Sequence, residues 1–248
     1  METAIIIPAR YASSRLPGKP LLRATGKYLI EHVYEQARRS GAGTVIVATD
    51  DERIYRAVHS FGGQAVMTRG DHPSGTDRVA EVAAELTADI IVNLQGDEPL
   101  IDPTTLDLLP ELLVQDSGAD LATLAAPITS LEAWRDPACV KVVCDVRGRA
   151  LYFSRSPIPF VRDGMPDFSQ KPPRFLQHLG LYAYRREFLL QLARTPPHPL
   201  EEVEKLEQLR VLAAGRAIQV GIVRHAGRGV DTPADYERFV SLYRQHAA

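Results

Sequence analysis

Short apolar runs rich in β-branched residues alternate with amphipathic stretches over the first half of the chain. We predict buried strands at residues 5–7, 44–48, 64–67, 88–94 and 121–128, and helices at 28–40, from about 75, and at 103–115. In each helix, apolar residues three and four positions apart mark the face that packs on a sheet. Strands that alternate with helices predict a Rossmann-like, mostly parallel α/β sheet flanked by helices, because parallel neighbours need a crossover connection.

The pattern changes in the second half of the chain. Residues 139–146 and 150–153 alternate in polarity around Arg147-Gly148, which is typical of a hairpin, and residues 178–184 alternate in the same way. We therefore predict a single domain over residues 1–248, with an antiparallel extension at 139–184 that covers the site and makes a dimer contact. A helix at 200–215 with Val203 on its inner face, a strand at 217–223 and a helix at 233–245 complete the prediction.

A loop rich in cations follows the first predicted strand. Pro8 lacks an N–H and is expected to end that strand, so the chain leaves the sheet at Ala9. The loop combines cations with small residues: Arg10, Arg15, Lys19, Ala12, Ser13, Ser14 and Gly18. Backbone N–H groups and cations can converge there on a polyanion such as a triphosphate, at the edge where open α/β sheets bind ligands. The spacing matches neither a Walker A loop nor a dinucleotide fingerprint.

Carboxylates follow two of the other predicted strands. Asp97 lies just beyond the strand at 88–94, after Gly96, which permits close approach of the backbone. A carboxylate there is well placed for Mg²⁺, which takes one or two carboxylates and completes its shell with phosphates and water; an ordinary turn residue is the alternative. Asp50 and Asp51 could also bind a metal, but we favour helix caps.

Composition limits the classes of function. The chain has 248 residues, 45% of them hydrophobic, with 29 basic and 31 acidic residues and a net charge of −2. These values favour a folded core and exclude general nucleic-acid binding. No apolar run approaches membrane-spanning length, and Met-Glu-Thr-Ala does not resemble a secretory signal, so we expect a cytoplasmic protein. Cys139 and Cys144 are expected to be buried, reduced thiols.

The segment P-A-R-Y-A-S-S-R-L-P-G-K-P-L resembles the signature of nucleotidyltransferases that make CMP-sugar acids, most closely those acting on 3-deoxy-manno-octulosonate (Kdo). The likeness continues in S-G-T-D-R, Q-G-D-E-P, Y-F-S-R-S-P, H-L-G-L-Y, L-E-Q-L-R and G-V-D-T-P. It implies transfer of CMP from CTP to Kdo for lipopolysaccharide synthesis, with Mg²⁺ as cofactor, in a homodimer. Three alternatives stay open: another sugar acid such as sialic acid or 8-amino-Kdo, a sugar 1-phosphate substrate, and a nucleotide-binding protein without turnover.

The resemblance also assigns roles to residues of this chain. It implies a catalytic set of Arg10, Arg15, Lys19 and Asp97, and metal ligands Asp97 and Asp231. The implied nucleotide-binding residues are Ala9, Arg10, Arg15, Lys19, Arg69, Ser74, Gly75, Arg78 and Gln95. The implied sugar-acid residues are Gln95, Arg155, His178, Tyr182, Glu207 and Gln208, with Arg155 paired to the carboxylate. For three of these residues a purely structural interpretation remains. Arg78 could be an exposed helix residue, Asp231 a turn residue, and Gln208 part of a solvated helix face.

Overall fold

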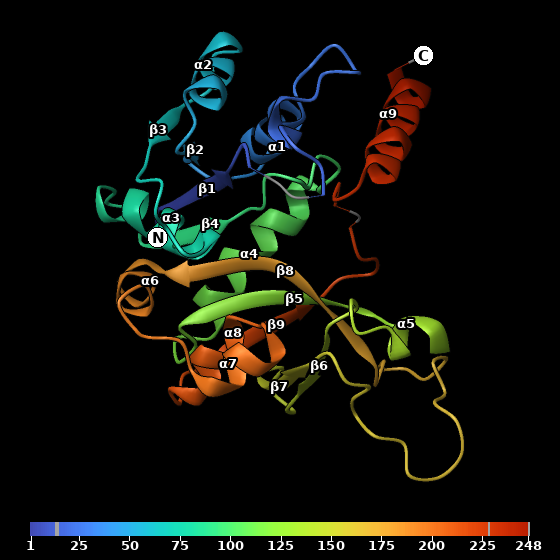
Figure 1. Cartoon of the computed structure of the whole chain (residues 1–248). Helices are drawn as coiled ribbons and strands as arrows, with labels where there is room; N and C mark the ends of the chain where they lie inside the picture. Colours follow the sequence, from blue (N-terminus) through green and yellow to red (C-terminus); the bar gives the residue numbers. More distant parts are fainter. Residues whose placement is uncertain (13–14, 228, 248) are drawn as a thin grey trace. The chain divides into compact units, whose positions relative to one another are not determined.

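The computed structural model describes residues 1–12, 15–227 and 229–247, so Ser13 and Ser14 of the predicted first loop lie outside the described residues. The chain divides into two compact units, one formed by Met1–Asp107 with Gly227–Ala248 and the other by Leu108–Ala226 (Figure 1). It passes from the first to the second within α4 (Pro103–Gln115). Among the described residues, no helix is both long and apolar enough to cross a membrane.

The first unit contains a parallel sheet. Its strands are β1 (Thr3–Ala9), β2 (Thr44–Thr49), β3 (Ala65–Met67) and β4 (Ile90–Asn93), in the order β3-β2-β1-β4. The helices of this unit are α1 (Leu29–Arg38), α2 (Glu52–Ser60), α3 (Gly75–Ala84) and α9 (Pro233–Ala247), with a 3₁₀ turn η1 at Lys19–Leu21. This arrangement confirms the predicted Rossmann-like α/β class, with β1 inside the sheet and its isoleucines fully buried.

The expectation that Pro8 ends the first strand is wrong. β1 continues through Pro8, which pairs with Ala48, to Ala9, which pairs with Thr49. The reason is that β4 pairs with β1 only as far as Ile6. Pro8 therefore has a strand neighbour on one side alone, where a missing N–H is tolerated.

An apolar cluster ties the two ends of this unit together. Leu16 of the first loop, Leu29 of α1 and Val230 pack with Phe239 and Val240 of α9, which is red in Figure 1. The ring of Phe239 also lies edge-on to His32 of α1, with the ring centroids 5.0 Å apart. The cluster therefore fixes the first loop and the segment before α9 on the same side of α1.

The second unit contains a mixed sheet. Its strands are β5 (Leu121–Pro127), β6 (Lys141–Cys144), β7 (Ala150–Ser154), β8 (Leu176–Arg185) and β9 (Ile218–Ile222). β9 is parallel to β5, whereas β8 is antiparallel to β5 and β6 is antiparallel to β7 and β8. The predicted hairpin is confirmed, with Gly148 at φ 79° in its turn. Its helices are α5 (Leu131–Arg135), α6 (Arg186–Leu192), α7 (Pro199–Glu204) and α8 (Gln208–Ala213).

The continuous helix predicted at 200–215 is wrong, because the chain breaks between α7 and α8. Lys205 adopts a left-handed conformation, with φ 54° and ψ 49°. The carbonyls of Glu204 and Lys205, which a continuing helix would give to residues 208 and 209, accept hydrogen bonds from the Arg155 guanidinium instead. Val203, predicted to face inward, is 83% exposed as a result.

Both cysteines are free thiols, as predicted, although their burial differs. Cys139 is buried, whereas Cys144 in β6 is half-buried. Burial, together with the charge of Asp145, raises the pKa of Cys144 to about 11. This side chain therefore remains a thiol at neutral pH and is a poor nucleophile.

The packing of β7 gives a test of the second unit. Phe153 is fully buried, and its ring lies edge-on to that of His178, with the centroids 4.9 Å apart. We expect Phe153→Ala to lower the free energy of unfolding by about 3–5 kcal/mol, measured by urea denaturation, because the cavity cannot fully collapse. Phe160→Ala, at a side chain 82% exposed, is the matched control and should change it by less than about 0.5 kcal/mol. Equal effects of the two variants would contradict this packing.

Candidate active site

A lysine joins two carboxylates at the carboxyl ends of the first unit's strands. Lys19 Nζ lies 2.7 Å from Asp97 Oδ2 and 3.3 Å from Asp231 Oδ1. Arg15 Nη2 is 3.1 Å from the same Asp231 oxygen. Residues from the first loop, the loop after β4 and the segment before α9 therefore share one cluster of charge, which the resemblance alone had implied.

Local backbone features bring these segments together. Gly18, at φ 66°, allows the turn that places Lys19 at the start of η1. A Cβ at Gly96 would lie 3.1 Å from the Pro8 carbonyl oxygen, so the small residue lets the loop after β4 approach β1. The Val230 N–H donates to the Asp97 carbonyl at 2.8 Å and fixes the C-terminal segment beside that loop.

Glu98 is a member of this cluster that sequence reasoning missed. Burial, and then the neighbouring charges of Asp97 and Asp231, raise the pKa of Glu98 to about 7. A Cβ at Gly229 would lie 3.2 Å from Glu98 Oε1, so the glycine segment before Asp231 packs closely on this carboxyl. The position of Glu98 in Q-G-D-E-P was the available signal, but a carboxylate next to Asp97 in sequence does not reveal its burial.

Three further predicted nucleotide residues lie near the same strand ends. Ala9 is the last residue of β1, and Arg10 follows it with an exposed side chain. Gln95 follows β4, and its Nε2 lies 3.4 Å from Asn93 Oδ1. Their contacts with a nucleotide remain predictions.

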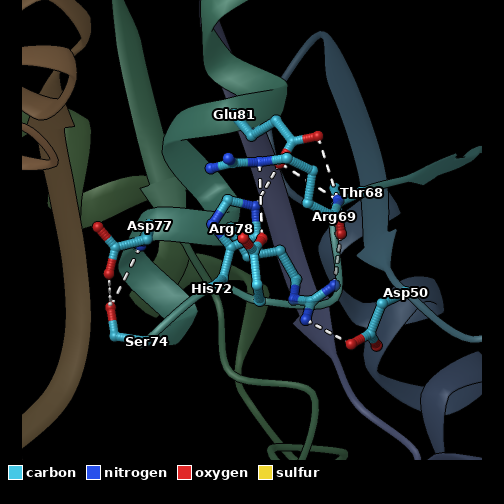
Figure 2. Close-up of polar contacts among 9 residues, drawn as sticks. Asp50, Thr68, Arg69, His72, Ser74, Asp77, Arg78 and Glu81 are labelled. Carbon is cyan, nitrogen blue, oxygen red and sulfur yellow. Dashed lines mark hydrogen bonds and ion pairs between the residues drawn. The ribbon is translucent and has the colours of Figure 1, made fainter.

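The loop at residues 68–74, which contains the start of the S-G-T-D-R motif, leads into the N-terminus of α3 (Figure 2). Ser74 is the N-cap, because its hydroxyl accepts from the Asp77 N–H at 3.2 Å and donates to the Asp77 carboxylate at 2.7 Å. Gly75 lies against the Pro8 ring, which a Cβ at residue 75 would approach to 3.6 Å. The helix start is therefore held beside the end of β1, with backbone N–H groups at its first turn.

Arg78 is buried, so its interpretation as an exposed helix residue is wrong. Its guanidinium donates to Thr68 Oγ1 and, at 2.9 Å, to Asp50 Oδ2 (Figure 2). The same contact gives Asp50 a structural partner, while Asp51 caps α2 by accepting from the Arg53 N–H. Within the described residues, Arg78 Nε has no hydrogen-bond partner. A contact between Arg78 and a nucleotide remains a prediction.

Arg69 lies on the exposed side of the same loop. Its backbone N–H donates to Glu81 Oε1 at 3.3 Å, and its Nε is 3.6 Å from Glu81 Oε2. Glu81 also contacts the buried His72 ring (Figure 2). The Glu81 carboxylate of α3 therefore holds the loop from residue 69 to residue 72 in place.

The second unit contains a cavity of about 350 Å³ beside β8 and the break between α7 and α8. It is lined by Ala138, Val140, His178, Gly180, Tyr182, Lys205, Leu206, Glu207 and Gln208. The structure thus brings together four of the predicted sugar-acid residues: His178, Tyr182, Glu207 and Gln208. The break at Lys205 is what places Glu207 and Gln208 at the start of α8, on the cavity wall.

Arg155 does not line this cavity but supports its wall. Its guanidinium donates to the carbonyl oxygens of Pro137, Glu204 and Lys205 at 3.0, 2.7 and 3.4 Å. The fully buried Lys141 ammonium donates in the same way to the carbonyls of Asp136, Cys139 and Arg155. Sequence reasoning missed Lys141, and it also missed Lys205, which does line the cavity.

Together these features are typical of an α/β protein that binds its ligand at the carboxyl ends of parallel strands, where cations and carboxylates meet here. A cytidylyltransferase family model matches residues 4–218. A 3-deoxy-manno-octulosonate cytidylyltransferase of Syntrophobacter fumaroxidans is 54% identical, over 100% of this chain and 99% of the relative. One of the same name from Escherichia coli is 48% identical, over 100% and 98%.

Solved structures of cytidylyltransferases are also similar to this chain. A CMP:2-keto-3-deoxy-manno-octonic acid synthetase complexed with CTP matches with a TM-score of 0.92 and 48% identity, over 99% of this chain and 100% of that one. A cytidylyltransferase from Leptospira borgpetersenii, at 19% identity and a TM-score of 0.66, shares the fold and covers 99% and 87% of the two chains. The chain belongs to the cytidylyltransferase family, and the resemblance stated from its motifs is confirmed.

The cavity also predicts a pH dependence of stability. Burial lowers the pKa of His178 from 6.5 to about 3. Between these values the unfolded chain binds a proton that the native protein does not, so stability falls as the pH decreases from 6.5 towards 3. In the wild type, the urea concentration at the midpoint of unfolding should decrease between pH 7 and pH 5. We expect a smaller decrease in His178→Gln and an unchanged decrease in His225→Gln, at an exposed histidine. An unchanged loss in His178→Gln would contradict the burial of a neutral ring.

Proposed function

We propose that the protein activates Kdo with CTP, giving CMP-Kdo and pyrophosphate. The observation that carries this proposal is the pair of sites, a cluster of cations and carboxylates in the first unit and a polar cavity in the second. The relatives and the CTP complex described above support the same substrates, and they do not favour another sugar acid. A place in lipopolysaccharide synthesis follows from this product.

The reaction makes particular demands on the first unit. The anomeric hydroxyl of the sugar attacks the α-phosphorus in line, and pyrophosphate leaves. Such a transfer needs little covalent work from the protein, so positioning and charge neutralisation supply most of the catalysis. Arg10, Arg15 and Lys19 would bind the triphosphate and stabilise the departing charge, while Ser74 and Gly75, at the start of α3, would meet the cytosine ring.

The donor set of the first unit fits Mg²⁺ as cofactor. The Lys19 ammonium, a cation, already lies between the carboxylates of Asp97 and Asp231. Mg²⁺ takes one or two carboxylates and completes its shell from phosphates and water, so two carboxylates are enough for it. Asp97 and Asp231 would hold the ion, which when bound supplies polarisation of the α-phosphate.

The second unit would bind the sugar acid. Glu207 and Gln208 can contact sugar hydroxyls, and Tyr182 lies beside them. A sugar carboxylate also needs a cation. The Arg155 guanidinium is occupied by backbone carbonyls, whereas Lys205 is one of the residues that line the cavity. Pairing of the carboxylate with Arg155 stays a prediction, and we place Lys205 beside it as a second candidate.

The experiment that tests this function is pyrophosphate release from CTP and Mg²⁺ with Kdo, N-acetylneuraminate or glucose 1-phosphate as acceptor. We expect release with Kdo alone. Release only with one of the other acceptors would refute the sugar assignment, and nucleotide binding without release would refute catalysis. Gel filtration with light scattering would test the homodimer, which remains a prediction, as does location in the cytoplasm.

The role of Lys19 gives a quantitative prediction. Lys19→Ala should lower kcat at saturating substrates by roughly 10²-fold or more, the effect of removing one donor that stabilises developing negative charge. Lys27→Ala is the control, because Lys27 forms an ion pair with Glu35 away from this cluster. A kcat near that of the wild type in Lys19→Ala would refute the role.

The role of Lys205 gives a separate prediction for the sugar. Lys205→Met should raise KM for Kdo by about 10- to 100-fold, as expected for loss of a charge-assisted hydrogen bond, and leave KM for CTP unchanged. Lys205→Arg should retain most of the affinity, and Lys171→Met, at an exposed lysine, is the control. An unchanged KM for Kdo in Lys205→Met, with a raised one in Arg155→Met, would assign the carboxylate to Arg155.

A further inference from the structure

A buried threonine contacts a residue that lines the cavity of the second unit. Thr123 of β5 is fully buried, in a strand whose neighbouring positions are leucine and alanine. Its Oγ1 lies 2.8 Å from the Leu181 carbonyl, 3.1 Å from the Leu179 carbonyl and 2.9 Å from His178 Nε2. The register of β5 against β8 shifts between Thr123 and Leu124, and this irregularity brings both carbonyls to one hydroxyl.

Counting protons fixes the direction of these hydrogen bonds. A threonine hydroxyl has one proton to donate, and a carbonyl oxygen can only accept. The shortest of the three contacts, 2.8 Å, joins the Thr123 hydroxyl to the Leu181 carbonyl, and only the hydroxyl has a proton to place between these two oxygens, so we assign the Thr123 proton to this carbonyl. The Thr123 oxygen then accepts from His178, which places a proton on His178 Nε2.

The tautomer of His178 determines the direction of the next hydrogen bonds in the cavity wall. Burial keeps the His178 ring neutral, so with its proton on Nε2 the ring presents Nδ1 as an acceptor, towards Gln208 Nε2 in a long contact of 3.5 Å. That orientation of the amide turns Gln208 Oε1 towards Tyr182, whose hydroxyl donates to it at 3.2 Å. Burial also raises the pKa of Tyr182 well above 10, so the phenol keeps the proton that it donates.

We propose that Thr123 is a positioning residue: its hydroxyl fixes the Nε2–H tautomer of His178 and, through Gln208, makes the Tyr182 oxygen an acceptor for a sugar hydroxyl in the cavity. The identity of that ligand rests on the proposed function, whereas the tautomer does not. Without the hydroxyl, the proton of His178 is free to move to Nδ1. The Gln208 amide then reverses, and the Tyr182 proton turns away from Gln208, so that the wall offers a donor in place of an acceptor.

The tautomer is read directly from the histidine ring nitrogens. Long-range ¹H–¹⁵N spectra of the ¹⁵N-labelled protein distinguish the two neutral tautomers, and loss of one signal set in His178→Gln assigns this ring. We expect the Nε2–H form in the wild type and in Thr123→Ser, and the Nδ1–H form or a mixture in Thr123→Val, which keeps the shape of the side chain. An Nδ1–H ring in the wild type would overturn the proposal without any variant, so the test survives if Thr123→Val fails to fold.

Kinetics test the consequence for the ligand. We expect Thr123→Val to raise KM for Kdo about tenfold, the effect of losing roughly one hydrogen bond, with KM for CTP unchanged and with recovery in Thr123→Ser. Tyr182→Phe should raise KM for Kdo by a similar factor, and the double variant should be no worse than the single ones, because both act through the same oxygen. Additive effects, or a wild-type KM in Thr123→Val, would overturn the positioning role. Absence of turnover with Kdo in the wild type would refute the proposed function and leave the tautomer result standing.

Discussion

The ion pairs of Lys19 with Asp97 and Asp231 are the constraint on which the first unit depends. The partners lie 78 and 212 residues from the lysine along the chain. Two like-charged carboxylates at one strand end repel each other, and the shared ammonium offsets that repulsion. The surrounding structure serves this contact: β1 supplies the buried base of the first loop, Gly96 permits the close approach of the loop after β4, and the apolar cluster of Leu16 and Val230 fixes the two outer segments.

Three cations of the second unit contact backbone carbonyls rather than carboxylates. The side chains of Lys141, Arg155 and Arg185 donate mainly to backbone carbonyls that no helix or strand satisfies, as Arg185 does to the carbonyls of Ala119 and Leu113. Buried carbonyls without a donor cost free energy, so each cation stabilises an irregular stretch of chain. The break between α7 and α8 depends on such a contact, and the cavity wall depends on that break.

The features that could be predicted from the sequence depend on residues close to one another along the chain. The isoleucine run predicted β1, and Ser74 before an apolar helical face predicted the start of α3, because both signals are local. The break at Lys205 could not be predicted, since the helical pattern continues on either side of it and its cause is Arg155, 50 residues away. Burial of Arg78 likewise depends on Asp50, 28 residues earlier. Thr123 indicated only strand propensity in an apolar run, and its importance emerges from the irregular register with β8.

The most direct test of the central claim is a crystal structure of the protein grown with CTP and Mn²⁺, with anomalous diffraction recorded to locate the metal. The claim is that Lys19, Arg15, Asp97 and Asp231 form a centre for a metal-bound triphosphate. It predicts an anomalous peak at coordination distance from the Asp97 carboxylate and triphosphate oxygens within hydrogen-bond reach of Lys19. A metal peak on other carboxylates, or a triphosphate bound away from Lys19, would contradict it.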